Sequence, residues 1–98
     1  MTEEQLVDQI TEQADSFGLL WHHCPDSRWC NGSRGFPDLL IAGRRGLLVP
    51  EVKLPHKTLS PGQVTWKYTL LASGQPWQLW QPGDWDSGQI HAELRSIA

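Results

Sequence analysis

Asp38, Glu51 and Lys53 are the residues whose types and spacing could do chemistry together. Two carboxylates supply the hard oxygen ligands that Mg²⁺ and Mn²⁺ prefer in proteins. A lysine beside a metal-bound water can orient that water, help to deprotonate it, or stabilise negative charge that develops on a phosphate. The reaction that suits this set is hydrolysis of a phosphodiester, provided that the fold brings the three side chains together.

A hairpin is predicted around these residues. Two apolar runs, 39–42 and 47–49, flank a short turn bounded by Gly43 and Gly46. Apolar runs on either side of a glycine-bounded turn are typical of an antiparallel β-hairpin. We therefore predict a hairpin within the stretch 35–53, which reads GFPDLLIAGRRGLLVPEVK.

The register of the hairpin decides whether the acids meet. If Arg44 and Arg45 are the two tip residues, counting outward along both strands places Asp38 opposite Glu51. Directly opposed side chains have Cβ atoms about 5 Å apart, so two carboxylates there repel each other unless a cation lies between them. Lys53 shares the face of Glu51, because side chains alternate along a strand.

The alternative is an ordinary ion pair at a strand end. We favour a functional site because the second strand is apolar on both faces, which is typical of a central, covered strand. Ionised groups are costly to bury there unless they are paired or ligated.

Length and charge place the site in a single domain with a basic middle. The 98 residues fit one domain, and we expect it to span residues 1–98. The net charge is −3, yet residues 27–67 are basic, whereas residues 1–26 carry acids and no lysine or arginine. A basic region around an acidic pair suits a metal-dependent enzyme on a polyanion, although basic residues scattered over a solvated surface would look similar. The candidates for contact with DNA phosphates are Ser27, Arg28, Arg34, Arg44, Arg45 and Lys57.

The two cysteines are expected to be reduced thiols. No segment is apolar for long enough to cross a bilayer, and the amino terminus is acidic rather than signal-like, so we expect a soluble, cytoplasmic protein. Thiols stay reduced in that compartment. A zinc site that joins Cys24 and Cys30 to His22 and His23 is the alternative, although Cys-x5-Cys is not a usual ligand spacing.

The first helix is predicted over residues 2–17, from apolar residues at three- and four-residue spacing. Glu3 lies on the face of Leu6 and Ile10, whereas Glu4 lies toward its edge. An acid on that face could reach a site at the sheet, or could only favour the amino end of the helix. Both interpretations stay open at this point.

Further elements follow along the chain. They are a strand over 19–23, a polar loop over 24–34, a helix opened by the capping box of Ser60, Pro61 and Gln63 and ended by Gly74, a strand over 77–80, and a short helix capped by Asp84 that carries Ile90, Leu94 and Ile97. The capping box alone would account for a glutamine at position 63, without a role in the active site. The tryptophans expected in the core are Trp66, Trp77, Trp80 and Trp85, while Trp29 lies in the polar loop. The order of elements predicts an α/β fold in which helices cover a mixed sheet.

Two short motifs carry a resemblance to a known family. Gly-Phe-Pro-Asp38 followed by Glu51-Val-Lys53 resembles the signature of the PD-(D/E)xK nucleases. More narrowly, the chain resembles the virus-type replication–repair nuclease domain, VRR-NUC, in its small, stand-alone, phage-type form. The supporting motifs are Leu59-Ser60-Pro61-x-Gln63-x-x-Trp66 and Leu79-Trp80-x-Pro82-x-Asp84-Trp85, and the similarity spans nearly the whole chain.

The resemblance implies a restriction-endonuclease-like αβββαβ core and an endonuclease that depends on Mg²⁺ or Mn²⁺. It also implies residue roles. Asp38, Glu51 and the backbone carbonyl of Val52 would bind the metal, Lys53 would be the catalytic lysine, Gln63 would be the helix glutamine near the site, and Glu3, with Glu4 as the fallback, would be the glutamate of the first helix.

Similar small proteins act on branched DNA, as Holliday junction resolvases do, and often work as homodimers. The resemblance therefore implies a structure-specific nuclease of DNA repair or recombination, in the host cytoplasm if phage-encoded. The alternative is a DNA-binding or assembly module that keeps the fold without turnover.

Two departures from the family pattern stand out. Pro50 removes a ladder donor just before Glu51, which predicts an edge or a bulge there and could disturb the register, and residues 56–58 lie where a glycine is expected.

Overall fold

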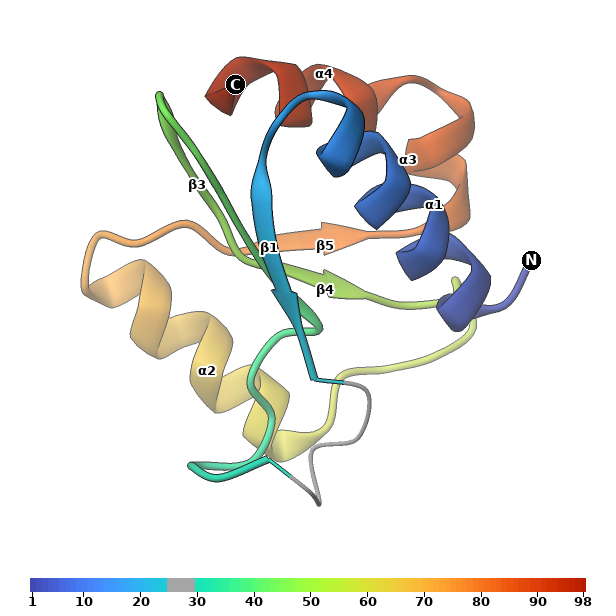
Figure 1. Cartoon of the computed structure of the whole chain (residues 1–98). Coiled ribbons are helices and arrows are strands. Elements are labelled where there is room, and N and C mark those ends of the chain that lie inside the picture. The colour runs from blue at the N-terminus through green and yellow to red at the C-terminus, as the bar shows by residue number, and fades with distance from the viewer. Residues whose placement is uncertain (25–29) are drawn as a thin grey trace.

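The predicted α/β fold, with helices covering mixed strands, is confirmed by the structure (Figure 1). The computed structural model describes residues 1–24 and 30–98. Its elements are α1 (Glu3–Ser16), β1 (Leu20–His23), β2 (Leu39–Gly43), β3 (Gly46–Leu48), β4 (Pro50–Val52), α2 (Pro61–Ala72), β5 (Gln78–Trp80), α3 (Pro82–Asp86) and α4 (Gln89–Ile97). Strands β1, β2 and β3 form an antiparallel sheet, and β4 pairs with β5 in parallel.

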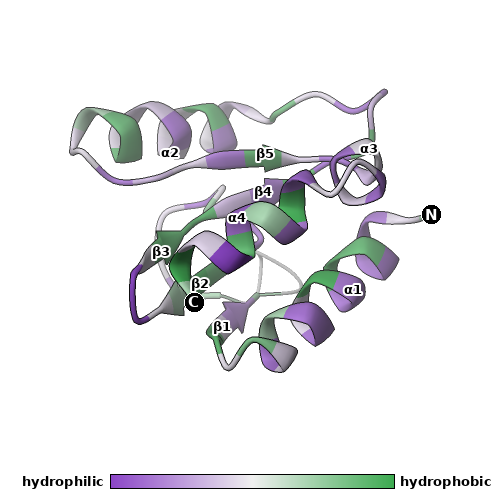
Figure 2. Ribbon diagram, turned by 90° about the horizontal axis from the view of Figure 1, so that it is seen from above, coloured by the Kyte–Doolittle hydropathy of each residue, from purple (hydrophilic) through white to green (hydrophobic). Residues whose placement is uncertain are grey.

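The core lies between the strands and two helices, α1 and α4. Its fully buried side chains come from α1 (Leu6, Ile10, Ala14), β2 (Leu39, Ile41), β4 (Val52), β5 (Trp80) and α4 (Ile90, Leu94). Helix α2 lies on the other side of the β4–β5 pair from α1 and α4 (Figure 2). In contrast to α1 and α4, α2 has no buried residue, so the apolar face expected on it remains largely open to solvent.

Helix α1 forms as predicted, and its capping explains where it starts. The Thr2 hydroxyl accepts a hydrogen bond from the Gln5 backbone N–H at 3.1 Å, and the Gln5 side chain accepts one from the Thr2 N–H at 2.9 Å. This reciprocal capping box satisfies two N–H groups that a helix start leaves free. Gly18 follows the helix at φ 72, a conformation that glycine adopts without strain. Residues on the inner face of α1, such as Ala14, are buried.

The hairpin register is also confirmed. Gly43 pairs with Gly46 and Ile41 pairs with Leu48 across β2 and β3, which leaves Arg44 and Arg45 at the tip. The predicted second strand, however, is divided into β3 and β4 after Leu48.

Pro50 supplies the physical reason for this division, because it has no N–H to donate to a ladder. Val49, just before it, turns away from β2 and donates its N–H to the Gln78 side-chain oxygen at 2.9 Å, and it accepts from the Gln78 N–H at 3.3 Å. The strand therefore changes partner from β2 to β5, as the expected interruption at Pro50 allows.

The carboxy-terminal helix corrects the capping prediction. Asp84 is not the cap residue, because Pro82 occupies the first helical position and moves the cap to Gln81. The Asp84 carboxylate accepts a hydrogen bond from the Gln81 N–H at 2.8 Å instead. Gly88, at φ 86, then separates α3 from α4, so the expected single helix becomes two. The apolar residues predicted for this region are buried on α4: Ile90, Leu94 and Ile97.

The tryptophans divide between the core and its edge. Trp80 is 1% exposed, and its Nε1 donates to a Glu93 carboxylate oxygen at 2.8 Å. The others expected in the core, Trp66, Trp77 and Trp85, are only half-buried. Trp66 lies on α2, which packs outside the main core, so the Trp66 ring lies at the edge of the core. Trp29 lies outside the described residues.

The expectation of reduced thiols is wrong in this structure, because a disulfide joins Cys24 to Cys30. The Cα atoms of these cysteines are 6.6 Å apart, within the range that a disulfide spans. The usual redox state of a compartment predicts free thiols, whereas the close approach of the two cysteines depends on the fold. The bridge occupies both sulfur atoms that the zinc alternative requires as thiolates. None of the helices in the described part of the chain combines the length and apolarity that a membrane span needs.

A close contact between two glycines fixes the start of α2. Gly35 has φ 95, and a Cβ added to it would overlap the backbone of Gly62 and Gln63. Around this contact, the Trp66 Nε1 donates to the Ser33 carbonyl at 3.1 Å, and the Trp66 ring meets Phe36 edge-on. The segment before β2 is therefore packed against the first turns of α2.

Gly35→Ala should destabilise the protein and displace the start of α2. We expect the positive φ alone to lower the free energy of unfolding by roughly 1–3 kcal/mol, and the overlap with α2 to lower it further, in urea denaturation. Gly74→Ala is the matched control, because Gly74 has φ 81 but nothing lies within 4 Å of its added Cβ. Equal losses in the two variants would contradict the role given to the close approach.

Candidate active site

Asp38 lies just before β2 and is held from two sides. Its carboxylate oxygen Oδ2 accepts a hydrogen bond from the Val52 backbone N–H at 2.8 Å, so its side chain is directed at β4. Its backbone carbonyl lies 2.7 Å from Nδ1 of His23 at the end of β1. Asp38 and Glu51 do not form the direct cross-strand pair that the register predicted, because the β2–β3 pairing ends at Ile41. The acids meet through the side chain of Asp38 rather than by direct strand pairing.

Glu51 lies in the middle of β4 and is 2% exposed. One of its carboxylate oxygens, Oε1, accepts a hydrogen bond from Gln63 Nε2 at 3.3 Å. The other, Oε2, is buried and has no hydrogen-bond partner among the described residues. Buried carboxylate oxygens are costly to leave unpaired, so this oxygen marks a place for a further group.

The surroundings of Glu51 raise its pKa to about 10. Burial is the largest cause, because it disfavours the charged form, and hydrogen bonding to Asp38 and the negative charge of Asp38 follow. Lys53 opposes the shift, whereas Glu3 adds to it. The four side chains that the sequence singled out for one site therefore interact in the fold.

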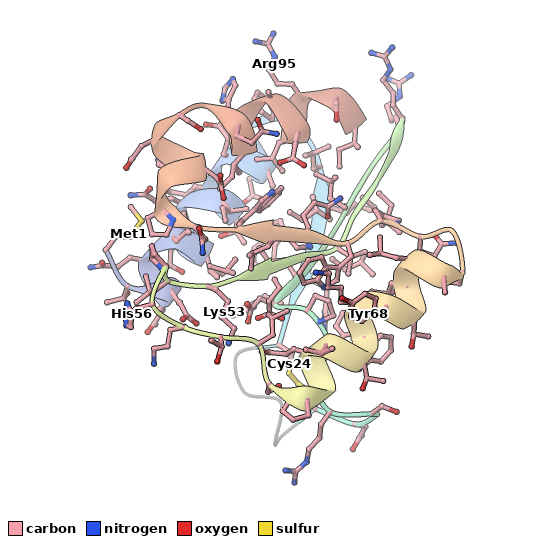
Figure 3. The ribbon with its side chains drawn as sticks, turned by 180° about the vertical axis from the view of Figure 1, so that it is seen from behind. Met1, Cys24, Lys53, His56, Tyr68 and Arg95 are labelled. Atoms are coloured by element: carbon pink, nitrogen blue, oxygen red, sulfur yellow. A yellow bond between two sulfur atoms is a disulfide. The ribbon has the colours of Figure 1, made fainter. Side chains whose placement is uncertain are left out.

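Lys53 and Glu3 reach the site from two different elements. Lys53 follows β4 directly, and its backbone N–H donates to the Trp80 carbonyl at 3.0 Å, which continues the β4–β5 pairing. In Figure 3, Lys53 lies where β4 ends, on the same side of the β4–β5 pair as Cys24. Glu3 is half-buried, and its Oε2 accepts from the Leu54 N–H at 3.4 Å. This contact distinguishes Glu3 from Glu4, which is exposed.

Gln63 serves the helix and the site at the same time. Its Oε1 accepts a hydrogen bond from the Ser60 N–H at 2.8 Å, and the Ser60 hydroxyl accepts from the Gln63 N–H at 3.3 Å, which is the predicted capping box. The same side chain donates from Nε2 to Glu51. Capping uses the oxygen of the amide and leaves its nitrogen free to donate, so a glutamine can do both.

A groove of about 550 Å³ opens beside Asp38. It is lined by the segment that leads into β2, including Arg34, and by the first turn of α2, including Gln63; the two disulfide cysteines lie at its wall. A second recess, of about 420 Å³, lies on the α1 side and is lined by Glu3, His23 and Asp38 among others. Asp38 thus borders both openings.

The structure separates the predicted phosphate contacts into two groups. Arg34 lines the groove, and Lys57 is exposed in the turn that follows β4. Arg44 and Arg45 lie at the hairpin tip, at the other end of β2 from Asp38. Ser27 and Arg28 lie outside the described residues.

His23 is the residue that sequence reasoning placed differently. The sequence indicates only a zinc-ligand role for it, whereas its ring contacts the Asp38 carbonyl. The signal available in the sequence was its position: the register of β1 and β2 pairs His23 with Leu39, next to Asp38. Only the pairing of β1 with β2 makes that position informative.

The residues present fit a divalent cation between Asp38 and Glu51. The Oε2 of Glu51 has no partner among the described residues, and burial beside Asp38 raises the pKa of this carboxyl, so a cation there would stabilise its ionised form. The described residues contain no group of three or more histidine, cysteine, aspartate or glutamate side chains placed to hold a metal by themselves. Mg²⁺ commonly uses one or two carboxylates and keeps several waters, so two acids and a backbone carbonyl suffice.

The arrangement of helices and strands matches the VRR-NUC nuclease-like fold. A solved structure described as "VRR_NUC domain protein" superposes on 99% of this chain and on 88% of its own, with a TM-score of 0.72. The sequence identity is 20%, so the likeness is one of fold. No family model and no curated protein sequence matches the chain.

The pKa of Glu51 predicts how stability depends on pH when no metal is bound. The carboxyl has a pKa of 4.5 without these surroundings and about 10 in the fold, so between these values the folded state binds a proton that the unfolded chain releases. The contribution of Glu51 is therefore full below the lower value and is lost as the pH rises toward the higher one. In chelator, the free energy of unfolding of the wild type should fall from about pH 5 to about pH 9 relative to that of Glu51→Gln.

Adding Mg²⁺ should reverse this difference, because the ion binds the ionised carboxylate and stabilises the folded state by mass action. We expect the wild type to gain more stability from Mg²⁺ at alkaline than at acidic pH, and Glu51→Gln to gain little. Glu12→Gln, which changes an exposed acid of α1, is the control and should follow the wild type. If the free energy of unfolding depends on pH in the same way in Glu51→Gln and the wild type, with and without Mg²⁺, Glu51 is not the metal ligand proposed here.

Proposed function

We propose that this protein is a Mg²⁺- or Mn²⁺-dependent DNA endonuclease that hydrolyses phosphodiester bonds. The observation that carries the proposal is the buried Glu51 carboxylate, which faces Asp38 with one oxygen unpartnered among the described residues. The likeness in fold to a VRR_NUC domain protein supports the same class of activity. A purely structural role would not need two acids placed against each other at this cost.

In the proposed site, Asp38, Glu51 and the Val52 carbonyl would hold the ion. When bound, the ion would polarise the scissile phosphate and lower the pKa of its own water. Asp38 is already oriented by the Val52 N–H, and Glu51 by the Gln63 amide, so both ligands are fixed before substrate arrives.

Lys53 would act on the reacting groups. Its ammonium group can orient the attacking water, or donate to a phosphate oxygen as negative charge grows there. Glu3 would extend the acidic side of the site from α1. Arg34 and Lys57 would contact the phosphates beside the bond that is cut, because they lie near the groove and the end of β4.

We further propose branched DNA, such as a Holliday junction, as the substrate, and a homodimer as the active form, because the sequence motifs resemble those of small nucleases of this kind. One site cuts one strand, so a symmetric cut needs two copies. Helix α2 offers a surface for association: Val64, Tyr68 and Leu71 are exposed, apolar or aromatic, and spaced along one helical face.

Asp38→Asn and Glu51→Gln should each abolish cleavage of DNA in Mg²⁺ or Mn²⁺, by at least about 100-fold in kcat/KM, because each removes an ion ligand. Lys53→Met should lower turnover to a similar extent but leave the affinity for Mn²⁺ within about threefold, as measured by calorimetric titration. Glu12→Gln is again the control. A panel of single strands, duplexes, flaps and four-way junctions would identify the substrate.

Retained metal-dependent cleavage in both carboxylate variants would contradict the proposal. Tight DNA binding that ignores metal, without cleavage of any substrate in the panel, would instead favour a binding module that keeps the fold.

Light scattering should give a mass about twice the 11.1 kDa of one chain at working concentration. Tyr68→Glu, which adds a charge to a side chain that is 63% exposed, should shift the protein toward monomer without lowering its stability. Leu20→Glu is a control, because Leu20 is also exposed but lies on β1, away from α2. A monomer at every concentration would refute the dimer.

A further inference from the structure

The tip of the β2–β3 hairpin is fixed to the end of α4. The Arg45 backbone N–H donates to the Ile97 carbonyl at 3.0 Å. Gly43 and Gly46, which bound the turn, lie directly against Ile97, and an added Cβ on either would overlap it. The tip is therefore held by the last turn of α4 rather than projecting freely.

Three arginines gather at this end of the molecule. Arg44 and Arg45 are exposed at the tip, and Arg95 is exposed in the last turn of α4, two residues before Ile97. Figure 3 shows Arg95 projecting from α4 at the end of the molecule where the hairpin tip also lies. These are three of the five arginines in the sequence.

None of the three guanidinium groups forms a hydrogen bond or an ion pair with the residues that the structure describes. Two acids of α4 and α1 are engaged elsewhere: Glu93 on α4 accepts from the Trp80 indole at 2.8 Å, and Asp15 at the end of α1 accepts from the Trp21 indole at 2.9 Å. In a chain with eleven acidic and eight basic residues, three unpaired arginines on a supported tip form a concentrated positive charge.

The tip is too far from the candidate active site to contact the phosphate that is cut. Asp38 and Arg44 lie at opposite ends of β2, and a strand advances roughly 3.3 Å per residue, so the two positions are separated by roughly 20 Å. Phosphates along one DNA strand advance roughly 3.4 Å per base pair. The separation therefore corresponds to roughly six base pairs of duplex.

We propose that Arg44, Arg45 and Arg95 form a second phosphate-binding site, which holds the backbone of duplex DNA about six base pairs from the bond cut at Asp38 and Glu51. Arginine suits this task because its planar guanidinium binds phosphate oxygens in pairs. The inference rests on the proposed nuclease function, and it adds a requirement on the substrate: a double-stranded arm long enough to reach from the carboxylates to the hairpin tip.

The test compares the wild type with Arg44→Gln/Arg45→Gln/Arg95→Gln. Junction or flap substrates carry duplex arms of increasing length, and kcat/KM is measured for each with Mg²⁺. For the wild type, kcat/KM should rise when the arm exceeds about six base pairs, and for the triple variant it should stay at the short-arm value. In chelator, the slope of log Kd against log salt for a long duplex should be smaller in the triple variant by about 2 to 3, because three phosphate contacts are lost.

The matched control is Arg44→Lys/Arg45→Lys/Arg95→Lys. It keeps the three charges and should therefore keep the wild-type salt slope, while losing part of the affinity that paired hydrogen bonds supply. Thermal unfolding of both variants should match the wild type, because all three side chains are exposed.

The outcomes separate this inference from the proposed function. Identical arm-length dependence and salt slope in the glutamine variant and the wild type would overturn the second site, even if cleavage occurs. Absence of cleavage by every protein, together with the reduced salt slope in the glutamine variant, would refute the nuclease proposal and retain the tip as a DNA contact.

Discussion

The contact between Asp38 and the buried Glu51 is the constraint on which the rest of this structure depends. Burial raises the pKa of Glu51, and the neighbouring Asp38 carboxyl raises it further, so the two groups cannot both ionise cheaply. Three contacts from the surrounding chain stabilise the two carboxyl groups. The Val52 N–H donates to Asp38, the Gln63 amide donates to Glu51, and the positive charge of Lys53 opposes the raised pKa of Glu51. One oxygen of Glu51 is left without a hydrogen bond among the described residues, and the cation that we propose would bind there.

Strand division is what makes room for this pair. A regular hairpin that continued past Ile41 and Leu48 would have paired the backbone of Asp38 directly with that of Glu51. Pro50 cannot donate to such a ladder, so the strand turns to β5, and the N–H of Val52 becomes available to the Asp38 side chain. Pro50, which could have disturbed the predicted register, therefore helps to form the site.

Helix starts supply the remaining contacts of the site. The first turn of α1 carries Glu3 to the chain after β4, and the first turn of α2 carries Gln63 to Glu51. Each helix begins with a capping box that fixes its first turn. The approach of Gly35 to Gly62 then sets the position of α2 against the strands. Local capping and one glycine contact thus determine how residues distant in sequence reach the same carboxylate.

The sequence by itself predicted the order of the main elements and the hairpin register, and it singled out Asp38, Glu51 and Lys53 as one group. These predictions were possible because hydrophobic spacing, capping motifs and the glycine-bounded turn each depend on only a few neighbouring residues. The local sequence is enough to specify such features. The similarity in motif to VRR-NUC domains agreed with the fold likeness, although only 20% of the aligned residues are identical.

Only the tertiary structure decided the exchange of strand partners at Pro50, the contact of Glu3 with the Leu54 N–H, the contact of His23 with Asp38, and the disulfide between Cys24 and Cys30. It also separated Arg34, beside the groove, from the arginines of the hairpin tip. Each of these depends on which distant segments pack together, and that is fixed by burial of the shared core rather than by any local pattern. The candidate residues could therefore be identified along the chain, whereas the geometry that arranges them could not.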